Sequence, residues 1–300
     1  MLKIAYSSIY KHPLPEGHRF PMIKYELIPE QLIYEGTVTK ENFFEPHAAK
    51  EEVILKTHTK IYWEKLKSLQ LSHQEERKTG FPLSNSLVER EVIINQGTID
   101  CSLFAIKYGV AMNVAGGTHH AYADRGEGFC LLNDIAMASN YLLDNTGINK
   151  VLVVDLDVHQ GNGTAKIFEN DPRVFTFSMH GATNYPMFKE KSDLDIPLKN
   201  GTDDETYLKI LNETLPKLLD EEKPDFIMYQ AGVDVLATDK LGKLGLSING
   251  CKERDRIVLN LCKNNNIPLT ISMGGGYSEK ISYIVEAHAN TYRLSQEIFF

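Results

Sequence analysis

The stretch that most constrains the fold is residues 151–163, VLVVDLDVHQGNG, which begins with four consecutive apolar residues. A short continuous apolar run of this kind is typical of a strand that is buried on both faces of a parallel sheet. Asp155, Asp157 and His159 then alternate with apolar residues, and the two-residue period of a strand would place their side chains on one side. The glycines that follow His159 allow a tight return into a helix.

These three polar residues restrict the chemistry as well as the fold. Two carboxylates and an imidazole are costly to bury unless a cation lies among them. Neutral imidazole and carboxylate oxygen are ordinary ligands of zinc. The stretch therefore predicts a divalent metal site at the end of a strand, with solvated acids at a strand end as the simpler alternative.

The rest of the chain alternates between strand-like and helical patterns. Early elements are expected as a strand at 2–6, helices near 25–32 and 54–69, and two helices over 87–108 separated near Gly97. Further strands are expected at 110–115, 174–179, 226–230 and 269–273, with helices near 131–143, 205–219 and 249–263, a polar loop over 181–204 and a C-terminal helix. This alternation indicates an α/β fold with a mostly parallel sheet and helices on both faces. No repeat or low-complexity tract divides the chain, so we expect one domain over residues 1–300.

Charge and composition argue against several classes of partner. The chain has a formal net charge of −8 and no block of lysines and arginines, which argues against nucleic acid or an anionic membrane as the main partner. It has no 18-residue apolar stretch and no secretory signal pattern near residue 1. The four cysteines are scattered without a CxxC pair, so we expect reduced thiols and a cytoplasmic protein.

Unusual residues follow several of the predicted strands. In open parallel sheets, ligands bind beyond the carboxyl ends of the strands. The residues expected there are His119, His120, Asp155, Asp157, His159, Asp234 and the segment 274–277, GGGY. Each has an ordinary explanation alone, such as a loop histidine pair, a capping aspartate or a tight turn. Four such clusters at successive strand ends favour one shared site.

The motifs that contain these residues resemble those of the histone deacetylase superfamily. They are GGTHH, DRGEGFCLLND, DLDVHQGNG, YQAGVDVLATDKLG and SMGGGY, in this order. Asn162 and the loop KEKSDLDIPL are most similar to class IV and related bacterial zinc-dependent deacetylases. The resemblance covers nearly the whole chain, since the segment HPLPEGHRFP also resembles bacterial members. It implies an arginase/deacetylase-like fold with the active site at the C-terminal ends of the strands.

The resemblance implies a metal set and a water-activating role for the metal. Asp157, His159 and Asp234 would bind one zinc ion and leave coordination positions open for substrate and water, as in a catalytic site. The ion would lower the pKa of bound water towards about 7 and polarise an amide carbonyl. A structural potassium ion, held by Ser178 and by backbone carbonyls near Asp155, Asp157 and His159, is a further expectation of the resemblance.

The same resemblance assigns proton transfer to the tandem histidines. Asp155 would orient His119 and favour its charged form. Asn162 stands where class I members have an aspartate, and an amide fixes the orientation of His120 without favouring its charged form. We therefore assign His120 as the general base and His119 as the charged partner.

Tyr277 matches the family tyrosine whose hydroxyl helps to hold the oxyanion. Substrate contacts are expected from Gly128, Phe129, Tyr185 and Gly275. Phe129 would form one wall of an acyl-lysine tunnel, although a core phenylalanine is the simpler reading. Tyr185 or Phe188 would form the opposite wall.

Two features near the expected entrance for the substrate are the loop 79–84 and Arg19. The loop 79–84 lacks the acid that class I enzymes use to grip the substrate backbone, which argues against strong backbone recognition. Arg19 is expected either to line an internal acetate cavity or to be an ordinary surface arginine.

These predictions together describe a zinc-dependent amidohydrolase that removes an acetyl or other acyl group from the side-chain amine of lysine in proteins. The alternatives are deacetylation of acetylpolyamines or other small amides, removal of longer acyl chains, and a catalytically silent binding protein on the same fold. A binuclear manganese ureohydrolase would need further metal-bridging acids, which the sequence does not offer. The native metal (zinc or ferrous iron) and the oligomeric state are left open.

Overall fold

The computed structural model describes all residues from 1 to 300 and contains one eight-stranded sheet. The strands are β1 (Lys3–Ala5), β2 (Phe43–Phe44), β3 (Val110–Asn113), β4 (Val151–Asp155), β5 (Val174–Gly181), β6 (Leu194–Leu198), β7 (Phe226–Gln230) and β8 (Leu269–Ser272). Their order is β2-β1-β3-β8-β7-β4-β5-β6, and every neighbouring pair is parallel. The expected single-domain α/β architecture is confirmed.

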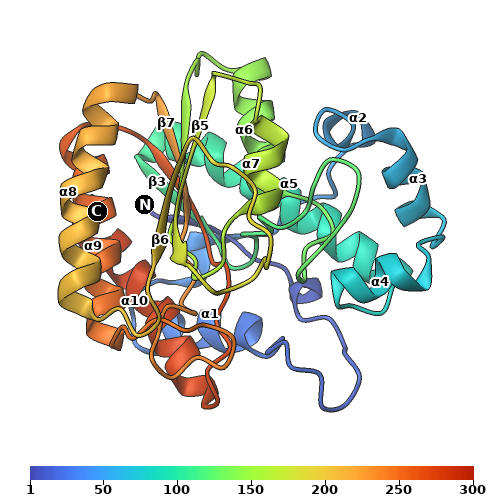
Figure 1. The fold of residues 1–300 in the computed structure, drawn as a ribbon, viewed down its shortest axis with the longest axis horizontal. Coiled ribbons are helices and arrows are strands. Elements are labelled where there is room, and N and C mark those ends of the chain that lie inside the picture. Colours follow the sequence, from blue (N-terminus) through green and yellow to red (C-terminus); the bar gives the residue numbers. More distant parts are fainter.

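Helices cover both faces of the sheet (Figure 1). They are α1 (Lys24–Tyr34), α2 (Glu51–Ile54), α3 (Lys60–Lys67), α4 (His73–Thr79), α5 (Asn85–Tyr108), α6 (Asp134–Asn145), α7 (Asn162–Phe168), α8 (Asp204–Glu222), α9 (Ile248–Asn264) and α10 (Ile281–Phe299). In Figure 1, α8, α9, α10 and α1 lie on one side of the sheet, and α5, α6 and α7 on the other. None of these helices combines the length and the apolar character needed to cross a lipid bilayer.

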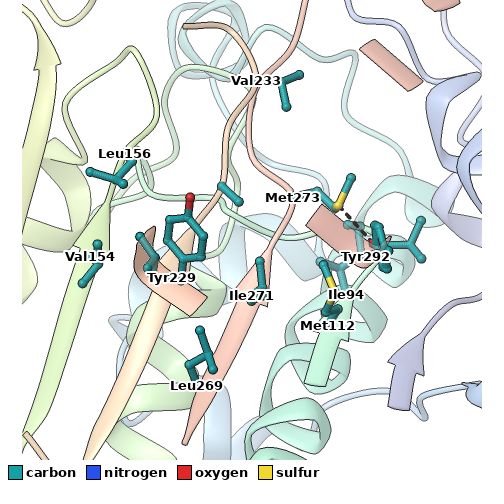
Figure 2. Close-up of a cluster of buried hydrophobic side chains, with 14 of the residues drawn as sticks. Ile94, Met112, Val154, Leu156, Tyr229, Val233, Leu269, Ile271, Met273 and Tyr292 are labelled. Carbon is teal, nitrogen blue, oxygen red and sulfur yellow. Dashed lines mark hydrogen bonds between the residues drawn. The ribbon is translucent and has the colours of Figure 1, made fainter. Parts of the chain in front are cut away.

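Successive side chains of the central strands enter two different apolar cores. Leu152 and Val154 belong to the larger core, whereas Val151 and Val153 belong to the smaller one. Figure 2 shows part of the larger core, where Val154 lies near residues of β7 and β8. Because both faces of β4 are buried, the continuous apolar run that predicted this strand is explained.

Polar side chains fix where several helices begin. Ser84, Asn133, Asp203 and Ser247 each accept a hydrogen bond from the backbone N–H three residues later. Such N-caps satisfy donors that the first helical turn leaves free. Short side chains at these positions therefore set the helix boundaries that the apolar spacing indicates only approximately.

The prediction of two helices separated near Gly97 is wrong. Helix α5 continues unbroken from Asn85 to Tyr108, with Gly97 buried inside it. A Cβ at Gly97 would lie 2.7 Å from the Tyr10 hydroxyl and 3.0 Å from Nδ2 of Asn113. The glycine therefore serves close packing against neighbouring segments and does not mark a break.

Two other segments also differ from the prediction. The helix expected near 54–69 is shorter than predicted: α2 already ends at Ile54, and α3 covers only Lys60–Lys67. The polar loop expected over 181–204 contains the strand β6, which pairs only with β5 at the edge of the sheet. This strand contains a proline, and most of its side chains are only half-buried, so its sequence lacks the apolar pattern of a strand. Proline is tolerated in strands at sheet edges.

Candidate active site

The candidate site is built by four loops that follow neighbouring strands. In the sheet order, β3, β8, β7 and β4 lie side by side, and all four are parallel. The loop after β3 carries the two histidines, the loop after β8 carries 274–277, and the loops after β7 and β4 carry the three expected metal ligands. Parallel strands end at one edge of the sheet, so four distant motifs meet there.

Asp157, His159 and Asp234 form a compact group that suits a metal ion. One ligand atom from each of the three lies within 4.8 Å of the others. Nδ1 of His159 is 3.0 Å from Oδ1 of Asp157 and 3.1 Å from Oδ2 of Asp234. Although His159 lies close to it, Oδ2 of Asp234 is buried and makes no well-directed hydrogen bond, so this oxygen is available to a metal ion. Three nitrogen and oxygen donors with further coordination positions open fit a catalytic zinc site.

The charges of this group also call for a cation. Burial alone would lower the pKa of His159, but the Asp157 and Asp234 carboxylates outweigh burial and raise it to about 10. Burial and the nearby Asp157 raise the pKa of Asp234 to about 7. A positive charge is therefore stabilised between the two carboxylates, whether it is a proton or a metal ion.

One geometric expectation for this stretch is wrong. Strand β4 ends at Asp155, so Asp157 and His159 lie in the following loop and not on one face of a strand. Asp155 is not one of the three grouped ligands: its Oδ2 lies 2.7 Å from Nδ1 of His119, and its Oδ1 accepts from the N–H of Asp157 at 3.2 Å. The loop, and not the strand period, brings Asp157 and His159 together.

The backbone of Gly275 packs closely against the candidate metal ligands. Its N–H donates to Oδ2 of Asp157 at 2.8 Å. A Cβ at this position would lie 2.0 Å from Oδ2 of Asp234. Gly275, which the sequence assigned to substrate binding, thus touches two of the candidate metal ligands.

The two adjacent histidines have different partners. Nδ1 of His120 lies 2.6 Å from Oδ1 of Asn162, whereas His119 faces the Asp155 carboxylate. Burial alone would lower the pKa of His119, but Asp155 and Asp157 outweigh it and raise this pKa. Burial and the neighbouring histidines hold the pKa of His120 well below its ordinary value. The arrangement agrees with a charged His119 beside a neutral His120.

Phe129 and Tyr185 line the approach to this group, together with Tyr277, His120 and His159. Phe129 adopts a positive φ of 67°, which is uncommon for a residue with a Cβ. Its ring packs against the Tyr277 ring at a centroid separation of 6.0 Å. The ring of Tyr185 lies 4.9 Å from that of His120. Phe129 therefore lines the groove as well as packing on the core.

The structure distinguishes between Tyr185 and Phe188, the two candidates for the opposite wall. Phe188 is 87% exposed and does not line the groove, so Tyr185 occupies that side. A Cβ at Gly128 would lie 2.6 Å from Cδ2 of His120. Gly128 thus allows the chain to pass close to that histidine.

Arg19 does not line an internal cavity. It is exposed at the mouth of the groove, and its guanidinium lies 5.2 Å from the centroid of the Phe129 ring. The inner cavity behind the histidines is lined by Tyr25, Arg90 and Ile94 among others.

Sequence reasoning missed three residues that hold the site in place. Asp239 accepts a hydrogen bond from the N–H of Tyr277 at 2.6 Å, and it lies within the quoted motif YQAGVDVLATDKLG. Tyr122 accepts from Nδ2 of Asn162 at 2.9 Å and so fixes the orientation of that amide. Lys24 is fully buried and donates to the carbonyl of Gly274 at 2.9 Å, and burial lowers its pKa to about 8. No sequence pattern singles out Lys24, because its partner is 250 residues away.

The sheet, the flanking helices and the group at the strand ends define an α/β protein of the deacetylase-like architecture. The model of the histone deacetylase domain matches residues 18–292. The chain belongs to the histone deacetylase family, and membership of this family supports a hydrolytic deacetylase activity.

Relatives of known sequence cover most of the chain. An uncharacterized protein of Picosynechococcus sp. is 40% identical over 296 residues, which is 99% of each chain. Histone deacetylase 2 of Arabidopsis thaliana is 31% identical and covers 95% of this chain and 76% of its own length. Human histone deacetylase 1 is 29% identical, covering 88% of this chain and 58% of the human protein. The crystal structure of the HDA15 HD domain has the same fold, with a TM-score of 0.82 at 20% identity, covering 96% of this chain and 89% of that one.

Proposed function

We propose that this protein is a zinc-dependent deacylase that hydrolyses the amide of an acetylated or otherwise acylated lysine side chain. The observation that carries the proposal is the meeting of Asp157, His159 and Asp234 at the inner end of a groove lined by aromatic rings. Two of the rings that line it, Phe129 and Tyr185, suit the aliphatic arm of lysine, since apolar walls bury methylene groups favourably.

The three ligands would hold a divalent ion. When bound, such an ion supplies Lewis-acid chemistry by acidifying a water molecule and polarising the acyl carbonyl. The hydroxyl of Tyr277, which lines the same groove, would donate to the carbonyl oxygen as negative charge develops on it. Burial and the nearby Asp234 and Asp157 raise the pKa of Tyr277 well above its usual range, so the phenol stays a donor.

The two histidines would move the protons. Because Oδ1 of Asn162 only accepts, Nδ1 of His120 carries the proton, and Nε2 is free to take one from the attacking water. His119, held charged by Asp155, would donate a proton to the leaving lysine nitrogen as the C–N bond breaks. One water is consumed, and a carboxylic acid and a free amine are formed.

The experiment compares acetyl-lysine peptides, longer acyl-lysine peptides and an acetylpolyamine as substrates of protein whose metal content has been measured. We expect turnover of an acyl-lysine peptide that is lost on chelation and restored by Zn²⁺. Full activity of metal-free protein would contradict the proposal, as would equal turnover by the parent and Tyr277→Phe.

A further inference from the structure

The mouth of the groove carries a set of charges that the proposed reaction does not use. Four basic side chains line it, namely Arg19, Arg77, Lys78 and Lys243. All four are exposed. Glu127 is the one acidic residue that lines the same groove. The chain as a whole has the opposite balance, with 40 acidic and 32 basic residues. We call these four residues the basic rim.

The carboxylate of Glu127 already has a hydrogen-bond partner at each of its two oxygens. Oε1 of Glu127 accepts from Arg125 at 3.0 Å, and Oε2 accepts from the hydroxyl of Tyr185 at 2.8 Å. Glu127 therefore has little remaining capacity to neutralise the basic rim.

The basic rim itself has no acidic partner. No side-chain nitrogen of the four residues lies within 4.0 Å of a carboxylate oxygen, in contrast to many other surface cations of this chain. The ammonium group of Lys243 hydrogen-bonds only to the Thr183 carbonyl and hydroxyl, at 3.2 and 3.4 Å, and Arg19 lies over the Phe129 ring. A positive charge in the last turn of a helix is stabilised by the helix dipole. This explains in part why Arg77 and Lys78 are tolerated at the end of α4 without an acidic partner. It does not account for Arg19 or Lys243, which lie in two separate loops.

The basic rim comes from three segments that are far apart in sequence. Arg19 precedes α1, Arg77 and Lys78 end α4, and Lys243 follows β7. All line the same depression as Phe129 and Tyr185. A lysine arm that enters between these aromatic rings would therefore bring its flanking residues into a positive field.

We propose that the groove selects acyl-lysines that are flanked by acidic residues and disfavours cationic substrates, including acetylpolyamines and lysine- or arginine-rich peptides. This inference rests on the proposed deacylase function and specifies its substrate class. An exposed ion pair changes binding by roughly 1.4- to 5-fold, so exchanging two acidic flanks for basic ones is expected to lower kcat/KM about tenfold at low salt. The effect falls mainly on KM, because these charges contact flanking residues and not the reacting atoms.

The test uses three peptides of equal length with one acetyl-lysine, flanked by Asp and Glu, by Ser and Gln, or by Lys and Arg, with N-acetylspermidine as a fourth substrate. Each is assayed on the full zinc-loaded chain at low and high salt. We expect the acidic peptide to be fastest, the two cationic substrates slowest, and the differences to shrink at high salt. In the double variant Arg77→Glu/Lys243→Glu, kcat/KM for the acidic peptide divided by kcat/KM for the basic peptide should fall below one. The matched control is Lys209→Glu/Lys217→Glu, which changes the same net charge on exposed positions of α8.

The outcomes separate this inference from the proposed function. Equal kcat/KM for all three peptides, or a preference for the basic peptide or N-acetylspermidine, would overturn the acidic-substrate inference while leaving a deacylase. A preference that survives in the rim variant, or that is lost equally in the α8 control, would also overturn it. Turnover of no acyl-lysine peptide would overturn the proposed function itself.

Discussion

Nδ1 of His120 lies 2.6 Å from the amide oxygen of Asn162, whereas the adjacent His119 has a carboxylate at the same ring position. The amide in turn donates to the hydroxyl of Tyr122, which donates to Glu190. Asn162 is therefore fixed with its oxygen towards His120. It sets the tautomer of that histidine without adding the negative charge that would favour imidazolium.

We expect Asn162→Asp to shift the acidic limb of the pH–rate profile to higher pH. A carboxylate beside His120 stabilises its charged form, so the base becomes protonated at a higher pH than in the parent. Asn162→Ala should lower kcat by up to about 10²-fold through loss of orientation. The profile of kcat/KM from pH 5 to 9 measures both effects. An acidic limb that stays in place in Asn162→Asp would contradict the role of His120 as base.

Tyr277→Phe should lower kcat by roughly 10²- to 10³-fold, because one donor to the developing oxyanion is lost. KM and metal content should change little, since the ring remains to pack on Phe129 and the hydroxyl is not one of the three metal ligands. Steady-state kinetics and elemental analysis of the purified variant check both. A large loss of bound metal would indicate a structural role instead.

Asp234→Asn is expected to abolish metal binding and activity without destabilising the metal-free protein. The variant removes a buried carboxylate whose pKa is raised to about 7 by burial and by Asp157, and an amide oxygen keeps the acceptor for the N–H of Val158. In the parent, by contrast, chelation should lower the melting temperature, because an ion that binds only the folded state stabilises it. Thermal unfolding with and without chelator distinguishes the two proteins. A metal-free variant much less stable than the metal-free parent would show that the charge of Asp234 is needed for folding.

Gly97→Ala should destabilise the protein by about 1–3 kcal/mol, although alanine is the better helix former by about 1 kcal/mol. The added methyl would meet the Tyr10 hydroxyl and Nδ2 of Asn113 within the packed core. Gly147→Ala is the control, because no atom lies within 4 Å of a Cβ there. Denaturant unfolding compares the two variants, and equal stability of Gly97→Ala and the parent would show that the neighbours of Gly97 move aside easily.

The same glycine illustrates what the sequence could reveal about the fold. Apolar runs located β4, β5, β7 and β8 closely, because strands buried on both faces have a continuous apolar pattern. Gly97 was misread because a glycine that permits close packing and one that ends a helix look the same without neighbours. Strand β6 was missed because half-buried edge strands lack such a pattern.

For the site, the sequence located the residues that carry unusual chemistry but not those that hold them. The histidine pair and the three candidate ligands stand out as costly polar groups after apolar strands. Lys24, Tyr122 and Asp239 do not, since their importance comes from contacts with distant backbone and side-chain atoms. The basic rim was also invisible, because its residues are scattered along the chain and gather only in the folded protein.

His58 should make the protein less stable as the pH falls from about 6.5 to 4. It is buried, its Nδ1 donates to the carbonyl of Tyr122 and its Nε2 accepts from the N–H of Asn133, each at 3.0 Å, so only the neutral ring satisfies both bonds. Burial lowers the pKa of His58 to about 4. Since the unfolded chain binds a proton near pH 6.5, the contribution of His58 is complete above that pH and is lost as the pH falls to 4, by about 3 kcal/mol in total.

In His58→Gln, the slope of unfolding free energy against pH between 4 and 6.5 should decrease by up to about 1.4 kcal/mol per pH unit. Glutamine offers one donor and one acceptor but no titrating group in this range. His73→Gln is the control, because His73 is exposed at the start of α4. Urea unfolding at several pH values gives the slopes. An unchanged slope in His58→Gln would mean that another group, such as the largely buried His180 with a pKa lowered to about 4 by burial, dominates the acid sensitivity.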